Sequence, residues 1–285
     1  MRWTPGGESE DVEDRRGEGG ARFGGGGMKL GLGLGGFILL AVLSLIFKRD
    51  FFALLDTGGT TAPQGESRPA DPAEQTKVQF VSFVLDDVQG TWEKQFQVSG
   101  RQYSHAKLVL FRESTRSGCG YAESQRGPFY CSEDQKVYID LGFFEELKNR
   151  FGAPGDFAQA YVLAHEVGHH VQRQLGIESR VRSEQEAHPD RRNALSVRME
   201  LQADCLAGVW AKSTEQRQIL EAGDVEEGLG AAAAVGDDRI QKGATGRVTP
   251  ETWTHGSSRE RVDWFKRGMS SGSLNACDTF SARSL

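Results

Sequence analysis

The 285-residue chain has only four cysteines, eight prolines and no marked excess of basic residues, with 34 basic and 40 acidic residues giving a net charge of −6. So few cysteines exclude a small disulfide-dense scaffold, and no Cys-x-x-Cys pair is present to build a zinc ribbon or a thioredoxin-type site. Without a general basic field, no nucleic-acid partner is expected. The length allows one domain of roughly 200 to 250 residues plus appendages.

Large apolar residues are nearly absent from the first 29 residues, which mix charges with glycine runs such as 24–27. A segment of this composition buries too little apolar surface to offset the entropy of ordering it. Residues 1–29 are therefore expected to form a disordered tail.

Residues 30–47 form a run of eighteen residues without a charge. As a helix this run would span about 27 Å, close to the hydrocarbon thickness of a bilayer. We predict a transmembrane helix, with a buried core helix as the weaker alternative. A cleaved signal peptide stays open, although Lys48 and Arg49 stand where a small-residue cleavage site would be expected. Gly31 and Gly35 form a GxxxG face compatible with helix-mediated self-association.

Basic residues flank this run on both sides, with more before it than after it: Arg15, Arg16, Arg22 and Lys29 against Lys48 and Arg49. This balance favours a single-pass protein with a cytoplasmic N-terminus and the remainder in the periplasm or outside the cell. Residues 48–76 contain several prolines and glycines among small polar residues, which is typical of an extended linker. The folded domain is expected at 77–285.

The pattern of the domain predicts an α+β fold with the strands first. Apolar residues three and four apart from Phe80 to Trp92 predict an opening helix that ends before Gly100. Short apolar runs predict strands at 107–111, 129–131 and 136–140, the last two as a hairpin.

The second half of the domain is expected to be mainly helical. The helical pattern begins after Asp156 and is interrupted by predicted loops around 176–190 and 243–256. Another helix is expected after Pro189 and includes residues 199–210.

Residues 160–175 contain His165, Glu166 and His169 in the HExxH spacing. On a helix, residues four apart share a face, so both imidazoles can bind one metal ion while Glu166 flanks it. Asp156 is expected as the N-cap and Gly176 as the C-terminal stop. Two histidines on one helix face can also be buried core residues with ordinary hydrogen-bond partners. A third ligand therefore decides between a metal site and this alternative.

Catalytic zinc sites of this kind use three protein ligands and keep one position open. The downstream candidates are Glu178, Glu184, Glu186, His188 and Glu200. We favour Glu200, which precedes Asp204 by four residues beside small residues that allow close helix approach: Ala203, Ala207 and Gly208. Asp204 is expected to accept the second N–H of a zinc-bound His. The alternative is that Glu200 and Asp204 lie on a solvent-exposed helix face, where the two carboxylates would repel each other.

The stretch 157–172, FAQAYVLAHEVGHHVQ, resembles the signature of the bacterial putative neutral zinc metallopeptidase family. The similarity covers nearly all of residues 77–280, including VYIDLGFF at 137–144 and ELQADC at 200–205. The resemblance implies a membrane anchor followed by a zincin-like, specifically gluzincin-like, catalytic domain. It implies metal on His165, His169 and Glu200, with Glu166 catalytic. Two departures are the long segment 1–27 and one extra residue in TRSGCG at 115–120.

The expected mechanism uses a zinc-activated water, with Glu166 as general base. His255 is a candidate donor to the developing oxyanion, and a surface or capping role is its alternative. His170 points about 100° away from His169 and is not expected to be a ligand. The strand at 136–140, expected as an edge strand of the hairpin, could align an extended peptide by strand addition.

The four cysteines suggest two disulfides. Cys119 and Cys131 would close a short loop, and Cys205 with Cys277 would tie the C-terminal tail to the helix of Glu200. Both bridges imply an oxidising compartment, whereas reduced thiols in the cytosol are the alternative.

The sequence therefore predicts a membrane-anchored zinc metallopeptidase that acts on a peptide or protein substrate. The alternative is a zinc-stabilised extracytoplasmic binding or assembly module without significant turnover. Such a module would have no need of a general base at position 166.

Overall fold

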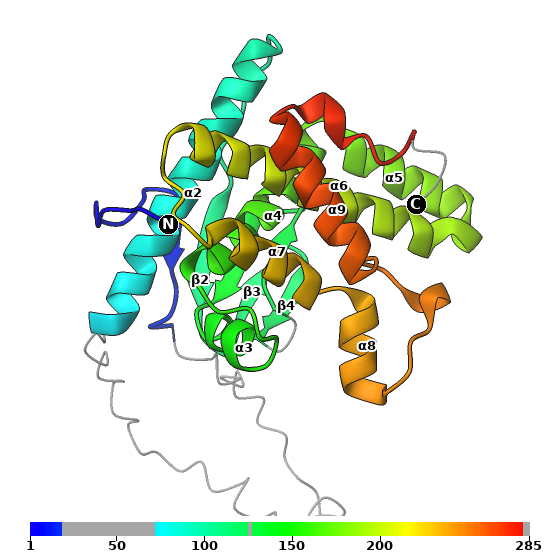
Figure 1. Ribbon diagram of the computed structural model, residues 1–285, viewed down its shortest axis with the longest axis horizontal. Coiled ribbons are helices and arrows are strands. Elements are labelled where there is room, and N and C mark those ends of the chain that lie inside the picture. Colours follow the sequence, from blue (N-terminus) through cyan, green and yellow to red (C-terminus); the bar gives the residue numbers. More distant parts are fainter. Residues whose placement is uncertain (19–71, 125–126, 282–285) are drawn as a thin grey trace, which may run out of the picture. The chain divides into compact units, whose positions relative to one another are not determined.

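The computed structural model describes residues 1–18, 72–124 and 127–281 (Figure 1). The chain divides into two compact units, 1–20 with 70–285 and 21–69, and the described residues belong to the first. The predicted transmembrane helix at 30–47 and the predicted linker up to residue 71 lie outside them. Among the described helices, none is long and apolar enough to cross a bilayer.

A four-stranded sheet has the order β1-β2-β6-β5. Its strands are β1 (Val12–Asp14), β2 (Lys107–Phe111), β6 (Lys136–Asp140) and β5 (Phe129–Cys131). β1 and β6 run parallel to β2, while β5 runs antiparallel to β6. The strands predicted at 107–111, 129–131 and 136–140 are confirmed. A separate hairpin pairs β3 (Ser114–Ser117) with β4 (Gly120–Glu123).

The predicted disordered tail is wrong for residues 1–18, because this segment belongs to the domain. β1 pairs with β2 through Val12 and Leu108, and Trp3 packs edge-on against Phe80 with ring centroids 5.3 Å apart. The composition gave little sign of this, since the stability of the segment comes from a strand and a helix far away in the chain.

The helices are α2 (Pro72–Val98), α3 (Phe143–Asn149), α4 (Asp156–Gln174), α5 (Ile177–Ala187), α6 (Arg192–Gln216), α7 (Asp224–Ala234), α8 (Asp237–Thr245) and α9 (Ser258–Ser271). Short 3₁₀ turns lie at Pro189–Arg191, Pro250–Thr252 and Leu274–Cys277. The predicted opening helix is confirmed, but it already begins at Pro72, inside the predicted linker. The loop predicted at 176–190 is mostly helix α5, whose charged sequence buries only Val181 and so lacks a clear apolar stripe.

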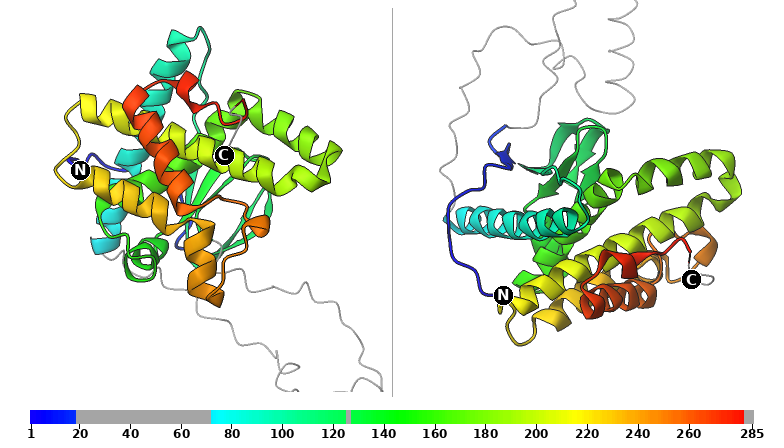
Figure 2. Two further views of the ribbon diagram at one scale, coloured as in Figure 1. Left: turned by 45° about the vertical axis from the view of Figure 1, so that its right-hand side comes forward. Right: turned by 90° about the horizontal axis from the view of Figure 1, so that it is seen from above.

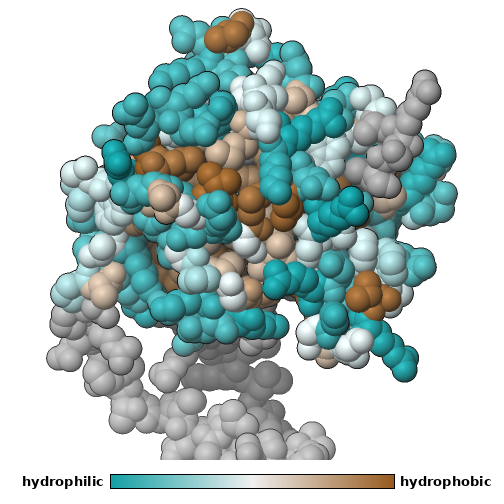
Figure 3. Space-filling view, viewed as in Figure 1, coloured by the Kyte–Doolittle hydropathy of each residue, from teal (hydrophilic) through white to brown (hydrophobic). Residues whose placement is uncertain are grey.

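Helix α4 lies at the centre of the domain, between the sheet with α2 on one side and α6 with α7 on the other (Figure 2). Its apolar residues, including Phe157, Tyr161 and Val167, are buried on several faces. Hydrophilic residues cover most of the face seen in Figure 3, with apolar residues gathered near its centre. The helix that carries the HExxH residues is thus packed between the sheet side and the helical side of the domain.

The start of α4 is capped by another helix. Gly155 rather than Asp156 is its N-cap, with φ 115°, and the Phe157 N–H donates to Glu227 of α7 at 3.1 Å. A Cβ on Gly155 would lie 2.0 Å from the Glu227 carboxyl, so only glycine fits there. The predicted C-terminal stop is confirmed, because Gly176 follows the helix in the left-handed conformation.

Small residues bring the site helices together. A Cβ on Gly168 of α4 would lie 3.2 Å from the Ala203 carbonyl oxygen of α6, so these two helices approach closely. Gly208, predicted to face α4, instead faces α9, where a Cβ would lie 2.1 Å from the Phe265 carbonyl oxygen. The tight α6–α9 contact is a feature that the sequence pattern did not indicate.

Both predicted disulfides are present, linking Cys119 to Cys131 and Cys205 to Cys277. The second joins the C-terminal segment to α6. Arg198 donates to the Phe280 carbonyl at 2.9 Å and further secures that segment.

Candidate metal centre

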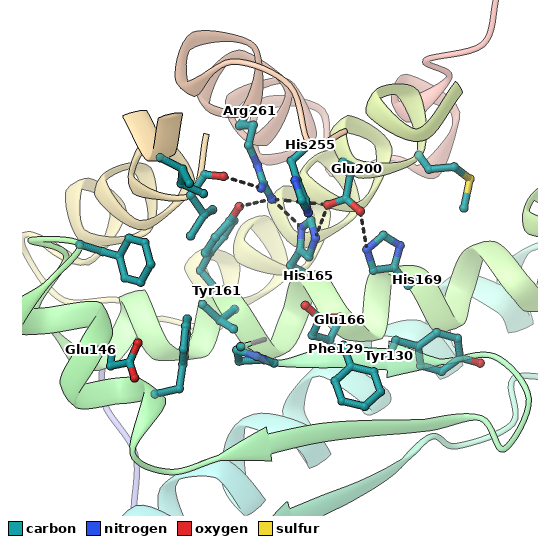
Figure 4. A pocket seen from close by; sticks show the side chains of 18 of the residues that line it. Phe129, Tyr130, Glu146, Tyr161, His165, Glu166, His169, Glu200, His255 and Arg261 are labelled. Carbon is teal, nitrogen blue, oxygen red and sulfur yellow. Dashed lines mark hydrogen bonds and ion pairs between the residues drawn. The ribbon is translucent and has the colours of Figure 1, made fainter. Parts of the chain in front are cut away.

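Three predicted ligands converge between α4 and α6. His165 Nε2 lies 3.2 Å from one oxygen of Glu200, and His169 Nε2 lies 3.5 Å from the other (Figure 4). Their ligand atoms all lie within 4.8 Å of one another. Ligand atoms about 2.0–2.1 Å from one tetrahedral zinc ion are about 3.3 Å apart. Two imidazoles and one carboxylate at this spacing fit a zinc ion.

His165 is oriented by a buried network. Its Nδ1–H donates at 2.9 Å to Asp204, which is fully buried on α6. Arg261 of α9 donates to both oxygens of Asp204, and the hydroxyl of Tyr161 donates to the same carboxylate. Because Asp204 holds Nδ1–H, Nε2 faces the ligand cluster and is the nitrogen that would bind a metal ion. The predicted partner role of Asp204 agrees with this geometry.

His169 is oriented by a neutral amide. Its Nδ1–H donates at 2.8 Å to Gln172 Oε1, and the Gln172 amide donates at 2.7 Å to the Met199 carbonyl beside Glu200. Gln172 thus links both ligand helices. The Gln172 amide also donates to Gln202 at 3.1 Å, and the Gln202 amide donates to the Cys277 carbonyl at 2.8 Å.

Charge stabilises the ionised carboxylates of the cluster. Burial alone would raise the pKa of Glu200, but the charges of His169 and His165 hold it below its ordinary value. Burial alone would lower the pKa of His165, but Asp204 and the hydrogen bond to Glu200 raise it to about 10. Metal binding requires a neutral imidazole, so binding here releases a proton and strengthens as pH rises.

His255 lies above the cluster, in the loop before α9 (Figure 4). Asp237 at the start of α8 receives the backbone N–H groups of Thr254, His255 and Gly256. Asp237 also lies 3.1 Å from His255 Nδ1, and this hydrogen bond raises the pKa of His255. Burial lowers that pKa and the charge of Glu200 raises it, so that the pKa lies above its ordinary value. The loop therefore holds the imidazole toward the cluster.

A cavity of about 630 Å³ opens beside the three ligands and is lined by Glu166, His255 and Arg261 among others. Glu166 lies between α4 and β5 on the cavity side of the imidazoles (Figure 4). The arrangement leaves one side of the cluster accessible to a bound molecule.

The strand beside the cavity is β5, with Phe129 and Tyr130 in its lining. The prediction that 136–140 is an edge strand is wrong: β6 lies between β2 and β5, and the edge strands of this sheet are β1 and β5. His170 is not a ligand, as expected; it donates from Nε2 to the Ser104 carbonyl at 2.7 Å and accepts from the Tyr130 hydroxyl at 2.9 Å. The hydrogen bond between Tyr130 and His170 joins β5 to α4.

The other candidate ligands lie elsewhere. Glu178 lines the cavity but pairs with Arg182 at 2.9 Å, while Glu184 and His188 lie 3.6 Å apart on the exposed end of α5. Glu186 is also on α5 and is largely solvent-accessible. Asp156, Asp224 and Glu227 form a second acidic group, in which Asp156 and Asp224 accept hydrogen bonds from the Met1 amino group. Sequence reasoning assigned no role to Gln172, although it lies three residues after His169, and it missed Asp237 and Arg261, which lie far from the HExxH residues in sequence.

A family profile describing putative neutral zinc metallopeptidases matches residues 1–280. The chain belongs to this family.

The chain is similar to uncharacterized bacterial proteins over much or nearly all of its length. The uncharacterized protein YpfJ of Escherichia coli is 50% identical over 284 residues, covering 98% of this chain and 99% of that protein. An uncharacterized protein of Mycobacterium tuberculosis is 46% identical over 194 residues, covering 64% of this chain and 65% of that protein. No solved structure matches the chain, so the zincin-like fold remains a prediction.

Proposed function

We propose that the chain is a peptidase in which Glu166 acts as general base on a peptide bond held beside His165, His169 and Glu200. The observation that carries this proposal is the open cavity at a three-ligand cluster. A structural zinc site normally fills its fourth position with protein. In the described part of the chain, no fourth His, Cys or carboxylate joins this cluster.

The chemistry divides among the residues of the cavity. A zinc ion bound there would polarise a carbonyl oxygen and lower the pKa of a bound water to about 7. Glu166 takes a proton from the attacking water and returns it to the leaving amine. His255, positioned by Asp237, donates to the oxyanion that develops on the carbonyl oxygen.

The substrate backbone would lie along β5. Only one side of this strand pairs with β6, so its other side can hydrogen-bond an extended peptide. The Tyr130–His170 bond would hold this strand at a constant distance from Glu166.

Membrane attachment through residues 30–47 remains part of the proposal, supported by their length without a charge. The two disulfides support an oxidising compartment. Any membrane arrangement must keep β1 and β2 on the same side, because the two strands share hydrogen bonds.

The test is Glu166→Gln in the zinc-loaded protein. Turnover of peptides should fall by about 10²–10⁴, because a general base contributes that much, while zinc content stays unchanged. Glu184→Gln is the matched control, since that carboxylate lies outside the cavity and should leave turnover unaltered. Normal turnover by Glu166→Gln would refute the base. Peptide binding without any cleavage by the wild type would instead favour the binding-module alternative.

A further inference from the structure

The cavity runs along α4, and its two ends differ in chemistry. Toward the C-terminal end of α4 its lining is polar and includes Tyr130, His169 and Glu178. Toward the N-terminal end the lining includes five apolar residues, with Glu146 and Arg150 beside them: Phe143, Phe151, Val162, Val235 and Ile240. Glu146 of α3 marks this end in Figure 4, well away from His169.

The apolar end is not closed core. Ile240 of α8 is 39% exposed, and Phe143 and Phe151 are half-buried, with ring centroids 6.3 Å apart. Large apolar groups in a concave, accessible position beside convergent polar groups are typical of a binding pocket.

The cations near this end already have partners. Arg150 lies 3.6 Å from Glu146 and covers the Phe151 ring, and Arg261 is bound by the buried Asp204. An acidic side chain entering here would approach Glu146 and Glu166, which both line the cavity, and would have to compete with Glu146 for Arg150. The pocket therefore disfavours a carboxylate relative to an apolar side chain.

Its position sets which part of a substrate it contacts. Val162 precedes His165 by three residues, and such neighbours on a helix have Cβ atoms about 5–6 Å apart. An extended peptide advances about 3.3 Å per residue, so the side chain next to a carbonyl held at the cluster reaches Val162. The pocket is thus adjacent to the bond to be cut.

We propose that this apolar end binds a bulky apolar side chain, of the leucine or phenylalanine type, on a residue directly flanking the scissile bond, and that it rejects aspartate and glutamate there. This substrate class rests on the proposed peptidase function. It adds a side-chain preference that the ligand cluster alone does not specify.

The experiment digests a position-varied peptide library with the zinc-loaded full chain and identifies the cleaved bonds by mass spectrometry. On one side of the cleaved bond, leucine or phenylalanine should exceed alanine by at least about tenfold in kcat/KM, and acidic residues should be absent. Cleavage without preference on either side would overturn this inference alone. Failure of the zinc-loaded wild type to cleave any peptide would overturn the proposed function, and this inference with it.

Two variants assign the preference to the pocket. Val162→Phe should fill it and lower kcat/KM for bulky peptides by about tenfold or more while sparing alanine peptides. Ile240→Ser changes a partly exposed residue, so the fold is preserved. This variant should lower the ratio of kcat/KM for bulky peptides to kcat/KM for alanine peptides. Tyr121→Ala, exposed on β4 outside the cavity, is the control. An equal loss for all peptides in both variants, at unchanged zinc content, would overturn the assignment.

Discussion

At the residue scale, the two imidazoles of the candidate metal centre have different supports. His165 donates to the ionised, buried Asp204, whereas His169 donates to the neutral amide of Gln172. A carboxylate partner makes an imidazole a stronger donor to a cation than an amide does. His165 is therefore expected to be the stronger metal ligand of the two, a difference that the HExxH spacing does not indicate.

Gln172→Leu should weaken zinc binding by about 10- to 100-fold, because His169 loses its partner and the Met199 carbonyl loses its donor. The measurement is a competition titration against a chelating dye. Gln174→Leu is the matched control, since that amide bonds Ser104 rather than a ligand. Unchanged affinity in Gln172→Leu would show that His169 needs no such support.

The predicted ligands that lie together in the structure are those with a local sequence signal. The spacing of His165, Glu166 and His169 follows from the helical period, and Glu200 with Asp204 follows from a second helix of the same kind. Arg261 lies 57 positions from Asp204 in sequence, too far for any helical spacing to pair the two residues. Such a partner is found only when α9 is seen packed on α6.

At the element scale, the N-terminal segment is joined to the domain by a cluster around His105. His105 lies 2.6 Å from Asp11 before β1 and 2.6 Å from Glu93 of α2, while Lys107 of β2 lies 2.7 Å from Asp11. Gln89 of α2 donates to Asp11 at 2.8 Å. Three elements therefore meet at one set of ion pairs.

These ion pairs predict a pH dependence of stability. Burial would lower the pKa of His105, but its bonds to Glu93 and Asp11 raise it above the ordinary value. The stabilisation is therefore full below about pH 6.5, the pKa in the unfolded chain, and is lost as pH rises through the raised folded-state pKa.

His105→Gln should lower Tm by no more than a few degrees at pH 6 and by almost nothing at pH 9, because exposed ion pairs contribute about 0.2–1 kcal/mol. Thermal unfolding followed by circular dichroism at both pH values measures it. His188→Gln, an exposed histidine 3.6 Å from Glu184, is the control. Equal losses at pH 6 and pH 9 would contradict this role of His105.

At the scale of the whole molecule, the sheet restricts the predicted membrane arrangement. A single crossing at 30–47 would put residues 1–18 and 72–281 on opposite faces of a bilayer. β1 and β2 are hydrogen-bonded neighbours, which excludes that arrangement for this fold. The prediction of a cytoplasmic N-terminus with an external domain therefore conflicts with the sheet, while membrane attachment itself remains a prediction.

Cysteine labelling tests the common location of the two segments. Thr4→Cys and Val98→Cys place thiols at exposed positions on either side of residues 30–47 in sequence. In intact cells a membrane-impermeant maleimide should label both or neither, and after lysis it should label both. Labelling of one site alone in intact cells would show that β1 and β2 are separated by the membrane.

The HExxH helix, the ligand candidates and the cysteine pairs could be predicted from the sequence, because helical periodicity and residue chemistry are readable over short spans. The sequence did not predict that residues 1–18 join the sheet, that β6 lies inside it with β5 at one edge, or that Asp237 and Arg261 support the site. These features depend on backbones and side chains far apart in sequence, whose contacts form only when the helices and strands pack.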